Sequence, residues 1–129
     1  MQNRPDHPTL LDAVASFLMA DVVPRLEADK ALQFRLLIAA NLATVVAGEL
    51  RTRTARFESE AARLGALHGS ATVPADDAAL EALNRQLATA LRNNALAPSQ
   101  LQGALNHLLA TARETLEVTN PRFELADEL

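Results

Sequence analysis

The chain has 129 residues, no cysteine, and a formal net charge of −4 from 16 acidic and 12 basic residues. Without cysteine it can form no disulfide, use no thiolate nucleophile and offer no cysteine ligand to a metal. A hydrophobic content of 49% is typical of a globular chain rather than a disordered one. The length predicts one domain that spans residues 1–129.

Neither nucleic acid nor a membrane is expected as a partner. Acidic residues outnumber basic ones, and the only aromatic side chains are four phenylalanines, so a basic or base-stacking surface is not indicated. No basic segment followed by an apolar run opens the chain, which argues against a signal peptide. The uncharged, mainly apolar run Leu36–Gly48 is shorter than the segment that crosses a bilayer core of about 30 Å. We therefore expect a cytoplasmic protein.

Apolar residues recur at helical spacing, and no segment alternates as a strand does, which predicts an all-α chain. The expected helices span residues 9–23, 30–67, 76–93 and 98–118, and an acidic C-terminal tail follows over 119–129. Their starts are indicated by Thr9 with Asp12, by Asp29, by Asp76 or Asp77, and by Pro98. Pro24 should end or kink the first helix. Mostly short connections predict an antiparallel four-helix bundle.

Each shorter helix carries an apolar row that we expect to face the core. The first row is Leu10, Val14, Phe17, Leu18 and Val22, the row of the third helix is Leu80, Leu83, Leu87 and Leu91, and that of the fourth is Leu101, Leu105, Leu108, Ala112 and Leu116.

The second helix is too long for its neighbours. From Leu32 to Leu67 it would span about 54 Å, against about 30 Å for the third and fourth helices. Its front half is uncharged from Leu36 to Gly48, and its back half is charged but keeps an apolar row. Either this helix bends near Gly48–Thr54 or its back half meets another chain. We expect a homo-oligomer, most simply a dimer, with the candidate interface residues Arg51, Arg53, Arg56, Phe57 and Leu64.

The arginines of this segment have two interpretations. Glu49 with Arg53, and Arg56 with Glu60, stand at the i,i+4 spacing of ion pairs on a solvated helix surface. Alternatively, the arginines form a docking patch for an acidic partner, because the planar guanidinium group suits carboxylates and phosphates.

Asn41 lies within the apolar half of the second helix, where burial of an unbonded amide would cost a few kcal/mol. One interpretation is a structural hydrogen bond to another helix or to a carbonyl near Pro24. The other is a ligand pocket inside the bundle, formed by Asn41 with Arg35 and Glu49.

The sequence contains no motif for catalysis, cofactor binding or metal binding. None of His7, His68 and His107 follows a glutamate at the spacing of di-iron bundles, and no H-E-x-x-H motif occurs. No serine lies in G-x-S-x-G, and the glycines form neither phosphate-binding pattern. The residues therefore give no argument for an enzyme, and we expect no catalytic residue, cofactor or metal.

Three segments resemble a known family: Leu10–Leu18, Phe34-Arg35 leading into Ala39–Leu50, and Asn120–Phe123. The family consists of small bacterial helical proteins and carries a domain-of-unknown-function label. Its members are often encoded beside aminoglycoside-phosphotransferase-like kinases and acyl-CoA dehydrogenases. The resemblance marks Phe34, Arg35, Asn41, Glu49 and Asn120-Pro121. It implies an accessory partner of such a kinase-like enzyme or acyl-CoA dehydrogenase, and it implies no activity.

Two functions follow from these observations. The first is a non-catalytic helical interaction or accessory module that self-associates. The alternative is a small-ligand-binding protein or enzyme with a pocket inside the helical bundle.

Overall fold

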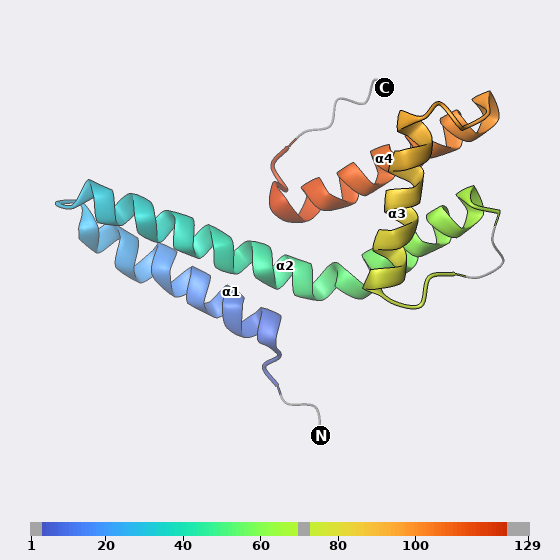
Figure 1. Cartoon of the computed structure of the whole chain (residues 1–129). Helices are drawn as coiled ribbons and strands as arrows, with labels where there is room; N and C mark the ends of the chain where they lie inside the picture. The colour runs from blue at the N-terminus through green and yellow to red at the C-terminus, as the bar shows by residue number, and fades with distance from the viewer. Residues whose placement is uncertain (1–3, 70–72, 124–129) are drawn as a thin grey trace. The chain divides into compact units, whose positions relative to one another are not determined.

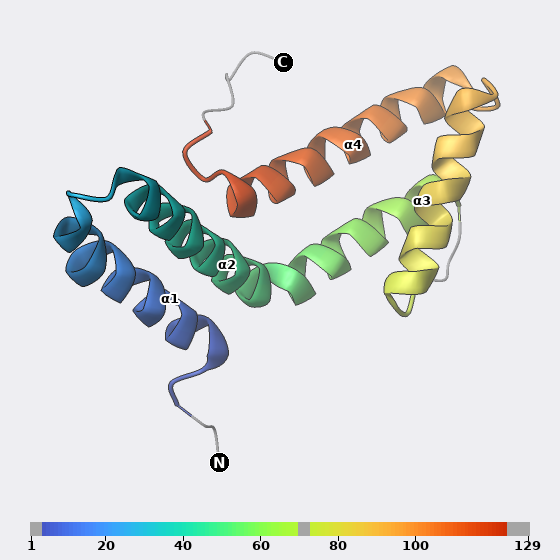
Figure 2. The same ribbon diagram turned by 60° about the vertical axis from the view of Figure 1, so that its left-hand side comes forward.

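The computed structural model describes residues 4–69 and 73–123, and every regular element in them is helical (Figures 1 and 2). This confirms the predicted all-α fold. The elements are α1 (His7–Phe17), the π-helix η1 (Leu18–Val22), the 3₁₀-helix η2 (Val23–Leu26), α2 (Lys30–Leu67), α3 (Asp77–Arg92) and α4 (Pro98–Thr119). Residues 124–129 of the predicted acidic tail lie outside the described residues.

The chain divides into two compact units, and the division falls inside α2. One unit ends at Arg53 and the other begins at Thr54. The helix itself is continuous from Lys30 to Leu67. We call residues 4–53 the hairpin unit and the described residues from Thr54 onward the core unit, and we describe each by itself.

In the hairpin unit, α1 lies antiparallel to the first half of α2 (Figures 1 and 2). Helix α1 begins two residues earlier than predicted because Asp6 is its cap: the Asp6 carboxylate accepts a bond of 3.0 Å from the backbone N–H of Thr9. After Phe17 the α-helix is followed by the π-helix η1 and then by the 3₁₀-helix η2, which contains Pro24. The turn ends at Asp29, whose carboxylate caps α2 at the N–H of Leu32, as the sequence predicts.

The core unit consists of the second half of α2 with α3 and α4. Asp76 caps α3 by accepting from the N–H of Ala79, and Pro98 is the first residue of α4. In both views α3 crosses the other two helices (Figures 1 and 2). A hydrogen bond of 2.8 Å from the Asn84 amide to the Glu60 carboxylate joins α3 to α2.

One hydrophobic cluster forms the centre of the core unit. Its buried members are Ala61, Leu64, Leu80, Leu87 and Ala104, and partly buried Phe57, Leu67, Leu83, Leu91 and Leu96 pack against them. The apolar row predicted for the third helix therefore does face the core. Apolar burial of this kind is the main term that stabilises a helical unit.

The face predicted for the fourth helix is wrong. Leu101, Leu105 and Leu108 are exposed, and α4 instead buries Ala104 and His107. The physical reason is close approach: a Cβ atom added to Gly103 would lie 2.7 Å from Cδ2 of Leu67. Helix α4 thus meets α2 through small residues, and the leucines of its neighbouring row are left outside.

Leu64 should be the most sensitive position of the core unit, because its side chain is 0% exposed. Leu64→Ala should lower the free energy of unfolding by about 2–5 kcal/mol, from lost transfer energy and the cavity left behind. Leu101→Ala, at an exposed leucine of α4, should change it by less than about 0.5 kcal/mol. Urea unfolding followed by circular dichroism measures both, and equal losses would contradict this assignment of the core.

Candidate interaction surface

The two helices of the hairpin unit meet through alanines. Its buried residues are Ala15 of α1 and Ala40 and Ala47 of α2, and no large apolar side chain is among them. Alanine lets two helix backbones approach closely, but it removes little apolar area from water. The contact between α1 and α2 therefore leaves most of the hydrophobic side chains of this unit without cover.

Several large side chains of α2 lie outside this contact. Phe34 is 64% exposed and Leu42 is 58% exposed, whereas the core-unit leucine Leu87 is 4% exposed. Five of the exposed residues recur at every fourth position and form a ridge of the kind that packs between helices. We call this row the α2 ridge: Phe34, Ile38, Leu42, Val46 and Leu50.

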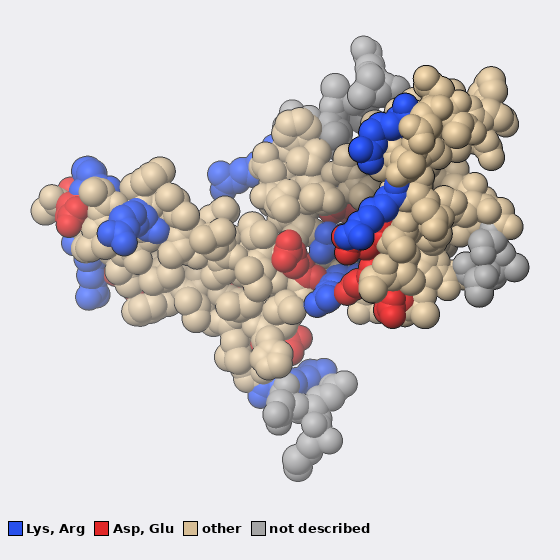
Figure 3. All heavy atoms as spheres, viewed as in Figure 1, with Lys and Arg blue, Asp and Glu red and all other residues tan. Residues whose placement is uncertain are grey.

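Helix α1 adds a second exposed row, Leu10, Val14 and Phe17, at i, i+4 and i+7. The sequence predicts that these residues face the core, but Ala15 is the residue of α1 that the hairpin buries. In the space-filling view, the surface over α1 and the first half of α2 is mostly uncharged, and charged groups gather near the turn between the helices (Figure 3). Exposed apolar patches of this kind mark interaction sites.

The three polar residues predicted to form a pocket do not form one. Arg35, Asn41 and Glu49 are all exposed on α2. The expected burial of Asn41 is wrong in this unit, because α1 covers one side of α2 and Asn41 lies next to that side, one residue after buried Ala40. A ligand pocket built on this amide has no enclosing wall in the hairpin unit.

The predicted interface residues divide between the two units. Arg51 is exposed in the hairpin unit and forms an ion pair of 2.6 Å with Asp12 of α1. Phe57 and Leu64 belong to the hydrophobic cluster of the core unit, and Leu64 is fully buried there. Arg53 is exposed and Arg56 is half-buried. The back half of α2 is therefore covered by α3 and α4 at Phe57 and Leu64, and it is the front half that presents apolar surface.

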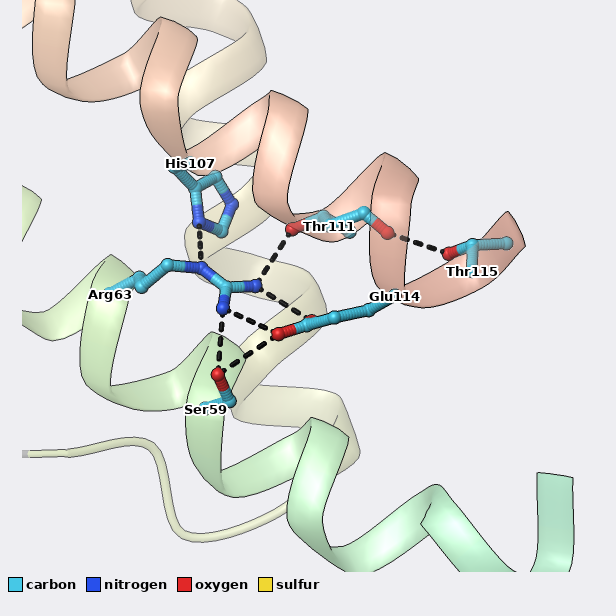
Figure 4. Close-up of polar contacts among 6 residues, drawn as sticks. All are labelled: Ser59, Arg63, His107, Thr111, Glu114 and Thr115. Carbon is cyan, nitrogen blue, oxygen red and sulfur yellow. Dashed lines mark hydrogen bonds and ion pairs between the residues drawn. The ribbon is translucent and has the colours of Figure 1, made fainter. Parts of the chain in front are cut away.

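A polar cluster that the sequence did not indicate joins α2 to α4 in the core unit (Figure 4). The Arg63 guanidinium donates to both carboxylate oxygens of Glu114, at 2.8 and 2.9 Å. It also donates to the hydroxyls of Ser59 and Thr111, and its Nε donates to Nδ1 of His107 at 3.4 Å. Ser59 in turn donates to Glu114 at 3.0 Å. Such bidentate, charge-assisted bonds are among the strong polar contacts in proteins.

These contacts shift the titration of the groups that make them. The hydrogen bonds from Arg63 lower the pKa of Glu114, and the same bonds raise the pKa of Arg63. Burial, followed by the nearby positive charge of Arg63, lowers the pKa of His107. His107 is 2% exposed and accepts at Nδ1, so the neutral ring fits this cluster. Among the described residues no buried side-chain nitrogen or oxygen lacks a hydrogen-bond partner. The cluster thus acts as a structural clamp between α2 and α4.

The chain matches a known family over most of its length. The sequence pattern of the family described as Domain of unknown function (DUF6285) matches residues 24–123. The chain belongs to this family. The match extends from Pro24 in η2 through α2, α3 and α4 to Phe123. No curated protein and no solved structure matches the chain.

Three further features of this DUF6285 member bear on ligands, membranes and metals. A pocket of about 180 Å³ in the core unit is lined by Leu67, His68, Leu87, Ala90, Leu96 and Gln100. It is smaller than typical ligand sites of about 300–1,000 Å³. Among the described helices, Lys30–Leu67 is long and apolar enough to cross a membrane by length and composition, which is weak support for a span. Within the described residues no cluster of potential metal ligands is found.

The Arg63 clamp predicts how stability depends on pH. In the unfolded chain His107 and Glu114 titrate near their ordinary values of 6.5 and 4.5, and in the folded chain both pKa values are lower. Near each of these pH values the unfolded state therefore binds more protons than the folded state does. The free energy of unfolding should decrease as the pH falls below about 6.5, and again as it falls below about 4.5.

Glu114→Gln tests the second step. The substitution should lower the free energy of unfolding by about 1–3 kcal/mol at pH 7. The difference in this free energy between the variant and the unchanged chain should become smaller below pH 4.5. Glu117→Gln, at an exposed position of the same helix, is the control and should have little effect at either pH. Urea midpoints measured between pH 8 and pH 3 supply the comparison, and a difference that stays constant with pH would refute this role of Glu114.

Proposed function

We propose that this chain is a non-catalytic helical interaction module that self-associates through its hairpin unit. The observation that carries the proposal is the distribution of side-chain size in that unit. Alanines are the fully buried residues of the contact between α1 and α2, and many large apolar side chains of the same helices are exposed. A second copy placed against the α2 ridge would bury these side chains in an antiparallel arrangement of four helices, two from each copy.

The energetic argument concerns the α2 ridge. Fully burying one exposed large apolar side chain contributes about 1.5–3 kcal/mol, and the central ridge residues Ile38, Leu42 and Val46 of each copy are 44%, 58% and 43% exposed. The core unit, by contrast, already surrounds its leucines with α3 and α4. The need for a partner is therefore greatest at the hairpin unit.

A protein partner suits this surface better than a bilayer does. The uncharged stretch of α2 runs from Leu36 to Gly48, about 20 Å of helix, between charged Arg35 and Glu49. A bilayer core is about 30 Å thick, so crossing it would bring a charged side chain into the hydrocarbon. A helical partner needs no such length, and its polar groups can lie beside Arg35 and Glu49.

Matched leucine substitutions test the proposal. Leu42 on the α2 ridge and Leu105 on α4 are exposed to a similar extent, 58% and 50%. Leu42→Glu should convert a dimer into a monomer, because a charge placed in an apolar interface loses its solvation. Leu105→Glu should leave the molar mass unchanged. Light scattering at concentrations from 1 to about 200 µM measures the mass, and circular dichroism checks that both variants keep their helices.

Two results would overturn the proposal. One is a strict monomer of the unchanged chain over this whole range. The other is dissociation by Leu105→Glu but not by Leu42→Glu, which would move the surface to α4. The enzyme partners implied by the family resemblance, a kinase-like phosphotransferase or an acyl-CoA dehydrogenase, are tested by co-purification with the same pair of variants.

A further inference from the structure

Two charged residues of α2 are placed symmetrically about Leu42 of the α2 ridge. Arg35 lies seven residues before Leu42, and Glu49 lies seven residues after it, about 10 Å along the helix in each direction. Both side chains are exposed. Between them α2 carries no other charge.

The apolar residues of the ridge share this centre. Ile38 and Val46 lie four residues on either side of Leu42 and only about 40° to either side of it around the helix. A ridge with matching residues on both sides of its midpoint is complementary to an antiparallel copy of itself. Two-fold symmetric dimers have this property: residue i contacts residue j of the partner, and j contacts i.

We propose that a second copy of this chain covers the α2 ridge in antiparallel orientation, with a two-fold axis beside Leu42. This inference rests on the self-association proposed above and specifies its orientation and register. Leu42 meets Leu42 of the partner copy, and Ile38 meets Val46 of the partner copy. Arg35 of each copy pairs with Glu49 of the other, so the dimer has two ion pairs at the two ends of an apolar contact.

Charge excludes the neighbouring arrangements. In a parallel dimer Arg35 would lie beside Arg35 and Glu49 beside Glu49, and both contacts would be repulsive. Shifting the two helices by about one turn, which moves the axis to Thr44, would place Arg35 opposite Arg53 of the partner copy. The opposite shift, which moves the axis to Ala40, would place Arg35 opposite apolar Val45. The charges thus select one orientation and one register, as polar residues beside an apolar helix seam do in other helical dimers.

A charge exchange tests the orientation. Arg35→Glu alone and Glu49→Arg alone should each raise the dimer dissociation constant about tenfold at low salt, since each replaces two attractive contacts with two repulsive ones. The double variant Arg35→Glu/Glu49→Arg should restore the original constant. Arg113→Glu, at an exposed position of α4, is the control and should leave it unchanged. Sedimentation at 20 mM and 500 mM salt measures the constants, and the effects should shrink at high salt.

Cysteine cross-linking tests the register, and the chain suits it because it has no cysteine of its own. A mixture of Ile38→Cys and Val46→Cys proteins should form disulfide-linked dimers on oxidation. Ile38→Cys alone should not, because the two cysteines would lie about 12 Å apart along the helix, beyond the reach of a disulfide. Leu42→Cys alone should cross-link to its own copy.

The outcomes separate the two proposals. A monomeric unchanged chain overturns the proposed function and this inference together. A dimer whose double charge variant is as weak as the single ones, or in which Ile38→Cys cross-links to itself but not to Val46→Cys, overturns the antiparallel register alone. Dissociation that responds to the charges, with cross-links in the predicted pairs, supports both.

Discussion

The contact between α1 and the first half of α2 is the constraint on which the hairpin unit depends. Because Ala15, Ala40 and Ala47 form its buried part, the helices can approach closely, but little apolar area is removed from water. Many large side chains of the same two helices then remain exposed outside this contact. A hairpin with small residues inside and large apolar residues outside can bury more apolar surface only against a partner, and a second hairpin supplies such a surface. This single feature links the local packing to the proposed self-association.

In the core unit, the apolar side chains are buried by helices of the same chain. Its section of α2 is covered by α3 and α4, and its buried leucines lie in one cluster. The approach of α4 depends on Gly103 and Ala104, and the bidentate bonds between Arg63 and Glu114 fix how the two helices align. Desolvating this ion pair costs energy, and the hydroxyls of Ser59 and Thr111 offset part of that cost by completing its hydrogen bonds. We regard the cluster as structural for this reason.

Local signals in the sequence predicted much of the helical architecture, and the faces of the helices were harder to predict. Asp29, Asp76 and Pro98 mark helix starts because capping and the missing proline N–H act within one turn. Which side of α4 is buried could not be read in the same way. Its leucine row and its Ala104–His107 row are adjacent, and the choice depends on how closely α2 approaches. Sequence periodicity favoured the larger residues, whereas packing selected the smaller ones.

The candidate sites followed the same pattern. Asn41 was expected to be buried because its neighbours are apolar, but an apolar neighbourhood on a helix is buried only where another helix covers it. The Arg63 clamp left no local signal because Ser59 and Glu114 are 55 positions apart. Arg35 and Glu49 were recognisable as charges that flank an apolar stretch. Their symmetric placement about Leu42 bears on dimer orientation only because the α2 ridge between them is exposed, and exposure cannot be read from the sequence.

Amide hydrogen exchange at two protein concentrations tests the central claim most directly, because it reports which helix becomes covered. A dimer formed through the hairpin unit predicts slower exchange for residues 34–50 at 200 µM than at 1 µM, with no change for residues 80–108. Exchange that is independent of concentration throughout α2, or that slows only around residues 101–108 of α4, would contradict the claim that the α2 ridge is the surface through which this chain associates.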